Sequence, residues 1–130
     1  MTVFVDTSAI YALLDRDDDG HVRALRGQEL LMGEDLVTHS YVLAEVISLV
    51  RQRLGPDATA RLIDDFLPAL RVVEVDEGLR ARATEAYRNA VRSAVSFVDR
   101  TSFELMRQLG TSRAFALDSD FDTAGFVLVS

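Results

Sequence analysis

Met1-Thr-Val-Phe-Val-Asp-Thr-Ser-Ala9 is the stretch around which the rest of the chain is organised. Val3, Phe4 and Val5 form a short apolar run, and apolar side chains on both faces are typical of a strand buried at the centre of a parallel sheet. The run ends at Asp6, and a helical pattern opens directly after it. A carboxylate is therefore predicted at the carboxyl end of a central strand, where open α/β sheets hold their sites. The alternative is that Asp6 only caps the following helix, and this stretch alone leaves both interpretations open.

The composition is that of one globular domain. The chain has 130 residues, of which 48% are hydrophobic, so we expect a single domain over residues 1–130 with room for a core. The absence of Cys excludes disulfides, thiolate metal sites and Cys nucleophiles. No apolar run approaches the length of a membrane span and the N-terminus does not resemble a secretory signal, so we expect no membrane contact and a cytoplasmic location.

The charge balance argues against one kind of nucleic-acid binding. A net charge of -7 opposes binding through bulk electrostatics. However, every basic residue is Arg, which suits bidentate phosphate contacts better than Lys does. The absence of Lys also excludes a P-loop lysine and Schiff-base chemistry.

Strand and helix patterns alternate along the rest of the chain. Further strands are predicted at 35–39, 71–75, 113–117 and 126–129. Helices are predicted after Asp6, around a stripe of Val22, Leu25, Leu30 and Leu31, and from the cap Ser40 to about Leu54. A further helix is predicted from Pro56 to about Leu70, with Leu62, Ile63, Phe66 and Leu67 as its core face. The last two are predicted from the cap Asp76 to about Ala94 and from the cap Ser96 to Gly110. This alternation, with short connections, predicts an α/β fold with a mostly parallel sheet.

Two predicted strands, the first and the fourth, end at an aspartate. These residues are Asp6 and Asp118, and a further acid, Asp120, follows two positions later. The segment from Asp118 onward is an acidic turn, a helix cap or part of a site, and its local pattern leaves all three open.

Two predicted helices each carry an acid among apolar residues. Glu45 lies either on the buried stripe of its helix, where a carboxylate needs a partner, or on the exposed edge. Asp99 stands three residues after Ser96, the position of a capping-box acid. It also shares a stripe with Phe103 and Met106, which favours a functional carboxylate over a solvated cap.

Alignment of neighbouring strands would bring these acids to one edge of the sheet. Unneutralised carboxylates so close together repel each other, which raises their pKa values, and a divalent cation relieves the repulsion. Ligands that are all oxygen favour Mg²⁺ or Mn²⁺ over zinc.

Four segments resemble the PIN-domain family, and closely its VapC type of toxin ribonuclease. They are 5–15, 38–45, 96–103 and 117–121, and their order and spacing extend the resemblance over essentially the whole chain. The resemblance implies a three-layer α/β/α sandwich that cleaves RNA with Mg²⁺ or Mn²⁺. It also implies a homodimer and a cognate antitoxin, whose basic tail would suit a strongly acidic toxin.

The resemblance also implies the site residues. The four family acids fall on Asp6, Glu45, Asp99 and Asp118, with Asp120 as a lower-ranked further ligand. Asp6, Asp99 and Asp118 are expected to bind the ion directly or through water. Glu45 is expected to help to bind a second ion or to orient the attacking water. One departure is Ala116, where many relatives have Thr.

Other functions remain as alternatives. A phosphatase with an aspartyl nucleophile needs a second Asp at position 8 and a lysine, whereas the chain has Ser8 and no lysine; a receiver-like signalling domain also needs a lysine. A PIN-fold module that has lost catalysis and only binds a partner is kept open by Ala116. The arginines that would guide RNA are not distinguished by the sequence, and the candidates are Arg16, Arg23, Arg51, Arg53, Arg88 and Arg92.

Overall fold

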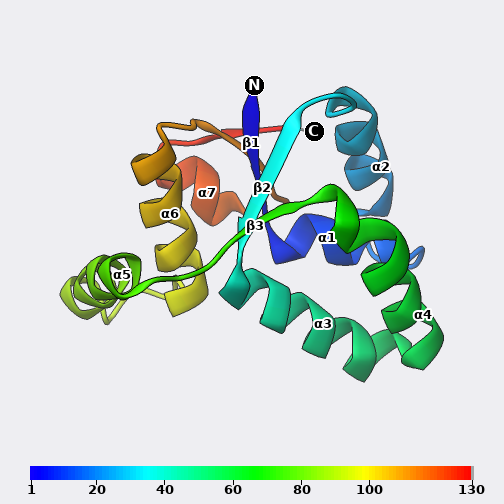
Figure 1. Ribbon diagram of the computed structural model, residues 1–130, viewed down its shortest axis with the longest axis horizontal. Coiled ribbons are helices and arrows are strands. Elements are labelled where there is room, and N and C mark those ends of the chain that lie inside the picture. Colours follow the sequence, from blue (N-terminus) through cyan, green and yellow to red (C-terminus); the bar gives the residue numbers. More distant parts are fainter. Residues whose placement is uncertain (130) are drawn as a thin grey trace.

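A five-stranded sheet forms the middle of the protein in a computed structural model that describes residues 1–129 (Figure 1). The strands are β1 (Thr2–Val5), β2 (Asp35–His39), β3 (Arg71–Val73), β4 (Arg113–Phe115) and β5 (Val127–Leu128). The helices are α1 (Thr7–Leu14), α2 (His21–Leu30), α3 (Ser40–Leu54), α4 (Pro56–Arg61), α5 (Glu77–Asn89), α6 (Phe97–Leu109) and α7 (Ser119–Thr123). Between α4 and β3 lie a π turn, η1 (Leu62–Phe66), and a 3-10 turn, η2 (Leu67–Ala69).

β1 is the central strand, as its apolar run predicted. The strand order is β3-β2-β1-β4-β5, and all four described pairings are parallel. Phe4 is fully buried and pairs with Val37 on one side and Ala114 on the other. The chain leaves β1 towards β2 and β3 and later returns to β4 on the opposite side. The winding thus reverses between β1 and β4, and open α/β sheets bind ligands at such a reversal, beyond the carboxyl ends of the strands.

Helices cover both faces of the sheet. Figure 1 shows α1 to α4 on one side of the strands and α5 to α7 on the other. The predicted three-layer α/β/α sandwich is therefore confirmed, with a sheet that is parallel throughout its described pairings. Over residues 1–129, no helix has both the length and the apolar character needed to cross a membrane.

The predicted apolar stripe of α2 is wrong for three of its four residues, although the helix itself forms and Leu31 is buried as predicted. Val22 and Leu30 are each 60% exposed, and the residues that α2 buries are Ala24 and Gly27. A Cβ atom added at Gly27 would come within 2.5 Å of Phe115 Cε1. The lack of a side chain at Gly27 allows α2 to approach this ring closely, whereas Val22, Leu25 and Leu30 face outward.

The helix predicted from Pro56 to about Leu70 is interrupted. α4 ends at Arg61, and the π turn that follows adds a residue to the turn and rotates the next side chains. Leu62 is buried as predicted, but Ile63, placed on the core face, is 46% exposed. Pro68 then cannot supply the N–H that a continuing helix needs.

Other predicted boundaries differ by a few residues. The helix expected to reach Ala94 ends at Asn89, because the chain closes two turns there, with bonds from Ala90 N to Tyr87 O and from Ser93 N to Ala90 O. The last three strands are each one or two residues shorter at an end than predicted. β2 has the predicted bounds and α3 ends at Leu54 as predicted, but the predicted cap Ser40 is wrong: Ser40 is the first helical residue, and the His39 side chain caps the helix.

Candidate metal centre

Asp6 uses one carboxylate oxygen to cap α1 and leaves the other unpartnered. Its Oδ2 accepts hydrogen bonds from the Ser8 N–H at 3.3 Å and the Ser8 hydroxyl at 2.7 Å. Asp6 is only 3% exposed, and its Oδ1 has no hydrogen-bond partner among residues 1–129. A buried polar atom without a partner is costly, and such atoms in native structures often mark an ion or water site. The capping and site interpretations of Asp6 are therefore compatible, because each engages a different oxygen.

Ser8 ties the end of β1 to the segment that follows β4. Its hydroxyl donates to Asp6 and accepts a hydrogen bond from the Leu117 N–H at 3.0 Å. The Asp6 N–H also donates to Phe115 O at 3.0 Å. These links hold Asp6 beside the residue that precedes Asp118. This role of Ser8 was not predicted from the sequence, where its signal is a hydroxyl two residues after a strand-ending acid.

Asp99, Asp118 and Asp120 come together beyond the same edge of the sheet. One carboxylate oxygen of each lies within 4.8 Å of those of the other two, and all three side chains are partly exposed. Asp99 belongs to the first turn of α6, whereas Asp118 caps α7 by accepting from the Asp120 N–H at 2.9 Å. This donor set is all oxygen, which suits Mg²⁺ or Mn²⁺. Asp120, ranked below Asp118 from the sequence, lies in the same cluster.

The carboxylate of Asp99 is not used as a capping group. Ser96 Oγ accepts from the Asp99 N–H at 3.1 Å, but no return bond from the Asp99 carboxylate is present in the described part of the chain. Burial raises the pKa of Asp99 to about 7, and the negative charges of Asp6, Asp118, Glu45 and Asp120 add to the rise. In the folded protein the acids therefore lie close enough to repel one another, as the sequence predicted.

Glu45 lies on the exposed edge of α3, so the buried-stripe alternative is wrong. The residues that α3 buries are Val42, Val46 and Val50. The charge of Glu45 nevertheless reaches the cluster, since it contributes to the raised pKa of Asp99. Burial also raises the pKa of Asp6 to about 6; hydrogen bonds from Ser8 oppose the rise and the charge of Glu45 adds to it.

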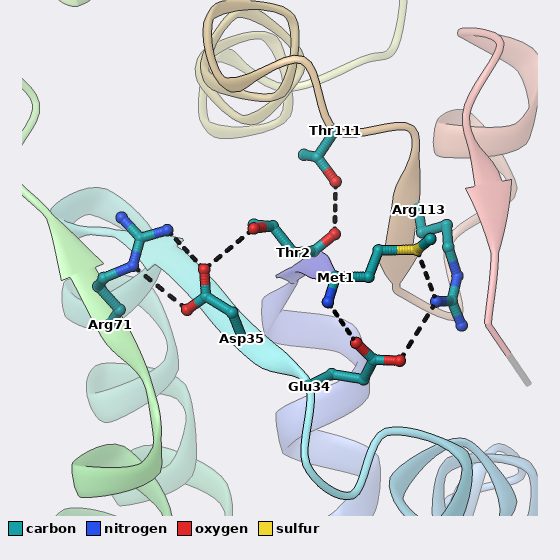
Figure 2. A network of polar contacts seen from close by, with 7 residues as sticks. All are labelled: Met1, Thr2, Glu34, Asp35, Arg71, Thr111 and Arg113. Carbon is teal, nitrogen blue, oxygen red and sulfur yellow. Dashed lines mark hydrogen bonds and ion pairs between the residues drawn. The ribbon is translucent and has the colours of Figure 1, made fainter.

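Charges are paired at the opposite edge of the sheet. At the amino ends of the strands, Arg71 Nη2 lies 2.8 Å from Asp35 Oδ2, and Arg113 reaches Glu34 (Figure 2). The Arg71 guanidinium, with the Thr2 hydroxyl, holds the pKa of Asp35 below its usual range. Over residues 1–129, by contrast, no Arg or His nitrogen lies within 4.0 Å of a carboxylate oxygen of the five candidate acids. The acids at the carboxyl edge therefore have no neutralising cation from the protein, and the residues present fit a divalent ion.

Known proteins share this sequence and architecture. The PIN-domain family matches residues 3–127. The 23S rRNA-specific endonuclease VapC20 of Mycobacterium tuberculosis is 36% identical over 130 residues, covering 98% of this chain and 97% of the relative. Its crystal structure, described as a Sarcin-Ricin loop cleaving toxin, superposes with a TM-score of 0.85 at 35% identity and covers 96% of each chain.

A more distant structure shares the fold alone. FitAcB from Neisseria gonorrhoeae superposes with a TM-score of 0.74 at 19% identity, over 100% of this chain and 97% of that one. Because the family match and the VapC20 match both extend over nearly the whole length, the chain belongs to the PIN-domain family, in its VapC type.

Proposed function

We propose that this protein is a metal-dependent endoribonuclease that hydrolyses RNA phosphodiester bonds and serves as the toxin of a toxin–antitoxin pair. The observation that carries the proposal is the gathering of acids at the reversal between β1 and β4, beside a buried Asp6 oxygen that has no protein partner. The name of the relative VapC20, a 23S rRNA-specific endonuclease, supports RNA as the substrate class and the cytoplasm as its setting.

The candidate acids have different roles in the proposed site. Asp99, Asp118 and Asp120 would hold Mg²⁺ or Mn²⁺, with Asp6 presenting its unpartnered oxygen from the end of β1. The chemistry supplied by a bound ion is the activation of water and the neutralisation of charge that develops on the phosphate. Glu45, exposed on α3, accepts a hydrogen bond from the attacking water and orients it, or contributes to a second ion. Titration of the protein with Mg²⁺ and with Mn²⁺ separately distinguishes the two as the bound ion.

Cleavage of an end-labelled RNA tests this proposal. Wild-type protein should cleave with Mg²⁺ or Mn²⁺ and stop with EDTA. Asp99→Asn should reduce the rate by at least roughly 10- to 100-fold, which is the usual cost of losing even an outer partner of a metal ligand. Asp57→Asn is the matched control, because Asp57 is an exposed acid on α4 outside the cluster. Wild-type protein that binds Mn²⁺ but cleaves no RNA would instead favour the catalytically inactive binding module. That alternative is supported by Ala116, which is fully buried and has no hydroxyl.

We also propose that the antitoxin covers the outward face of α2. Leu25 and Leu30 on α2 and Met32 just after it are 41%, 60% and 82% exposed. Met32 also lines an adjoining cavity of about 410 Å³, together with Leu31 and Phe66. These residues are close in the sequence, and exposed large apolar side chains that gather on a surface often mark a protein interface. Leu30→Asp should weaken co-purification with the protein encoded alongside, while RNA cleavage by the free toxin stays unchanged.

The homodimer implied by the family resemblance is part of the same proposal. Light scattering on the purified protein measures its mass in solution, and a mass of one chain would contradict it.

A further inference from the structure

His39 is a fully buried histidine at the junction of β2 and α3. Its Nδ1 accepts hydrogen bonds from the backbone N–H groups of Tyr41 and Val42, at 3.2 and 3.3 Å, and so caps α3. Its Nε2 lies 2.9 Å from the hydroxyl of Ser102, which is also fully buried and belongs to α6. One imidazole ring thereby connects the end of a strand with two helices.

The directions of these hydrogen bonds are determined by the donors. Because Nδ1 faces two N–H groups, it carries no proton, and the proton of the neutral ring is on Nε2. Nε2 therefore donates to Ser102 Oγ, and the Ser102 hydroxyl donates to Val98 O at 3.1 Å. Burial lowers the pKa of His39 to about 4, so the ring is neutral at physiological pH. Both ring nitrogens are satisfied, and the chain of bonds has one consistent direction.

The two helices joined by this bond each carry a candidate site acid. Glu45 lies one turn after Tyr41 on α3, and Asp99 lies three residues before Ser102 on α6. Elsewhere, α3 packs mainly on α1 and α4, whereas α6 packs mainly on α5. The His39–Ser102 bond is therefore a direct connection between two helices whose main packing partners differ.

We propose that His39 is a positioning residue that, acting through Ser102, sets the placement of Glu45 relative to Asp99. This inference rests on the proposed function, since it concerns the same acids. The Phe4 ring lies against the imidazole, with centroids 5.7 Å apart, and restricts its movement. The ring is held by Phe4, caps α3 and is hydrogen-bonded to Ser102 of α6. The position of one helix therefore influences the position of the other. Groups that orient metal ligands from a second layer typically change metal affinity by 10- to 100-fold when they are removed.

Two single variants and their combination test the connection. In His39→Asn the side-chain oxygen still caps α3 but is too short to reach Ser102. Ser102→Ala removes the other end of the same bond. Isothermal titration with Mn²⁺ alone should show about tenfold weaker binding for each single variant. The double variant should be no weaker than either, because both changes break one connection. In RNA cleavage, kcat should fall while KM for RNA stays unchanged.

Asp76→Ala is the control for a purely structural effect. Asp76 caps α5 by accepting from the Leu79 N–H at 2.9 Å, and α5 carries none of the candidate acids. This variant should melt at a lower temperature than wild type and bind Mn²⁺ equally well.

The outcomes separate the positioning role from the proposed function. Folded His39→Asn and Ser102→Ala proteins that bind Mn²⁺ as wild type does would overturn the positioning role and leave the nuclease proposal standing. Losses of affinity that add in the double variant would also overturn it, because they indicate two independent effects. Wild-type protein that neither binds Mn²⁺ nor cleaves RNA would overturn the proposed function itself, and the positioning role with it. If His39→Asn does not fold, Ser102→Ala alone decides between these outcomes.

Discussion

Replacing Asp6 by Asn should stabilise the metal-free protein at pH 7.5 and abolish its response to Mn²⁺. Burial raises the pKa of Asp6 from an ordinary 3.8 to about 6, so an ionised carboxylate is held in the core at neutral pH. Between these two values the folded state binds more protons than the unfolded state. The free energy of unfolding therefore falls as the pH rises from about 4 to about 6, and the full penalty is present at pH 7.5.

The magnitude follows from the pKa difference and the chemistry of the replacement. The rise from 3.8 to about 6 corresponds to about 3 kcal/mol, at 1.36 kcal/mol for each tenfold change in proton affinity. Asn keeps an oxygen that accepts from the Ser8 N–H, but the hydrogen bonds from Ser8 lose the charge of their acceptor and the amide group is buried, at a cost of about 1–2 kcal/mol. The net gain is about 1–2 kcal/mol, or a rise in Tm of roughly 4–8 °C.

The assay is urea unfolding followed by far-UV circular dichroism, in EDTA, from pH 4 to pH 8. The advantage of Asp6→Asn should be present at pH 7.5, and towards pH 4 it should reverse to a deficit of about 1–2 kcal/mol, because the cost of the buried amide remains when the charge penalty is gone. With Mn²⁺ at 100 times its dissociation constant, wild type should gain about 2.7 kcal/mol and the variant should gain little. Asp35→Asn is the control of opposite sign: Arg71 holds the pKa of Asp35 below its usual range, so the loss of this charge should destabilise the protein at neutral pH. A less stable Asp6→Asn protein at every pH would refute the reasoning and leave Asp6 as a helix cap.

Two further predictions concern the core. Because burial lowers the pKa of His39 from 6.5 to about 4, its contribution to stability is fully present above pH 6.5 and is lost as the pH falls towards 4, by up to about 3 kcal/mol. His39→Asn should remove this part of the pH dependence in urea unfolding, whereas an unchanged slope would assign the acid sensitivity to other groups. Gly27→Ala should destabilise the protein by about 1–3 kcal/mol, because the new Cβ would come within 2.5 Å of the Phe115 ring. The exposed neighbour Gln28, changed to Ala, should alter the unfolding free energy by less than about 0.5 kcal/mol, and equal effects at both positions would contradict the close packing of α2.

Features that depend on neighbouring residues were predictable from the sequence. The run from Val3 to Val5 identified the central strand, and the predicted bounds of β2 and the predicted end of α3 were correct. The caps of α5 and α6 were also recognised, because Asp76 and Ser96 act within one turn of the chain. Alternation of these elements was sufficient for the fold class, since strands joined through helices form parallel sheets.

Features that depend on which face of an element is covered were predicted less well. The stripe of α2 was assigned to the core because its residues are apolar, but periodicity does not show which side meets the sheet. Phe115 decides this at Gly27, because its ring leaves no room there for a Cβ atom. The π turn after α4 likewise changed the face of the helix on which Ile63 lies. No residue in that segment predicts a π turn from the sequence.

The sequence by itself determined the order of the elements, the central position of β1 and the set of acids that end strands or begin helices. These features depend on the local propensities of the residues and on the pattern of apolar residues, both of which can be read from the sequence. Only the tertiary structure decided which acids meet, which oxygen of Asp6 has no partner, and that Glu45 is exposed. Those properties arise from contacts such as Ser8 with Leu117, 109 residues apart, and His39 with Ser102, 63 residues apart. Contacts over such separations form only when the sheet closes, so no short stretch of the chain contains them.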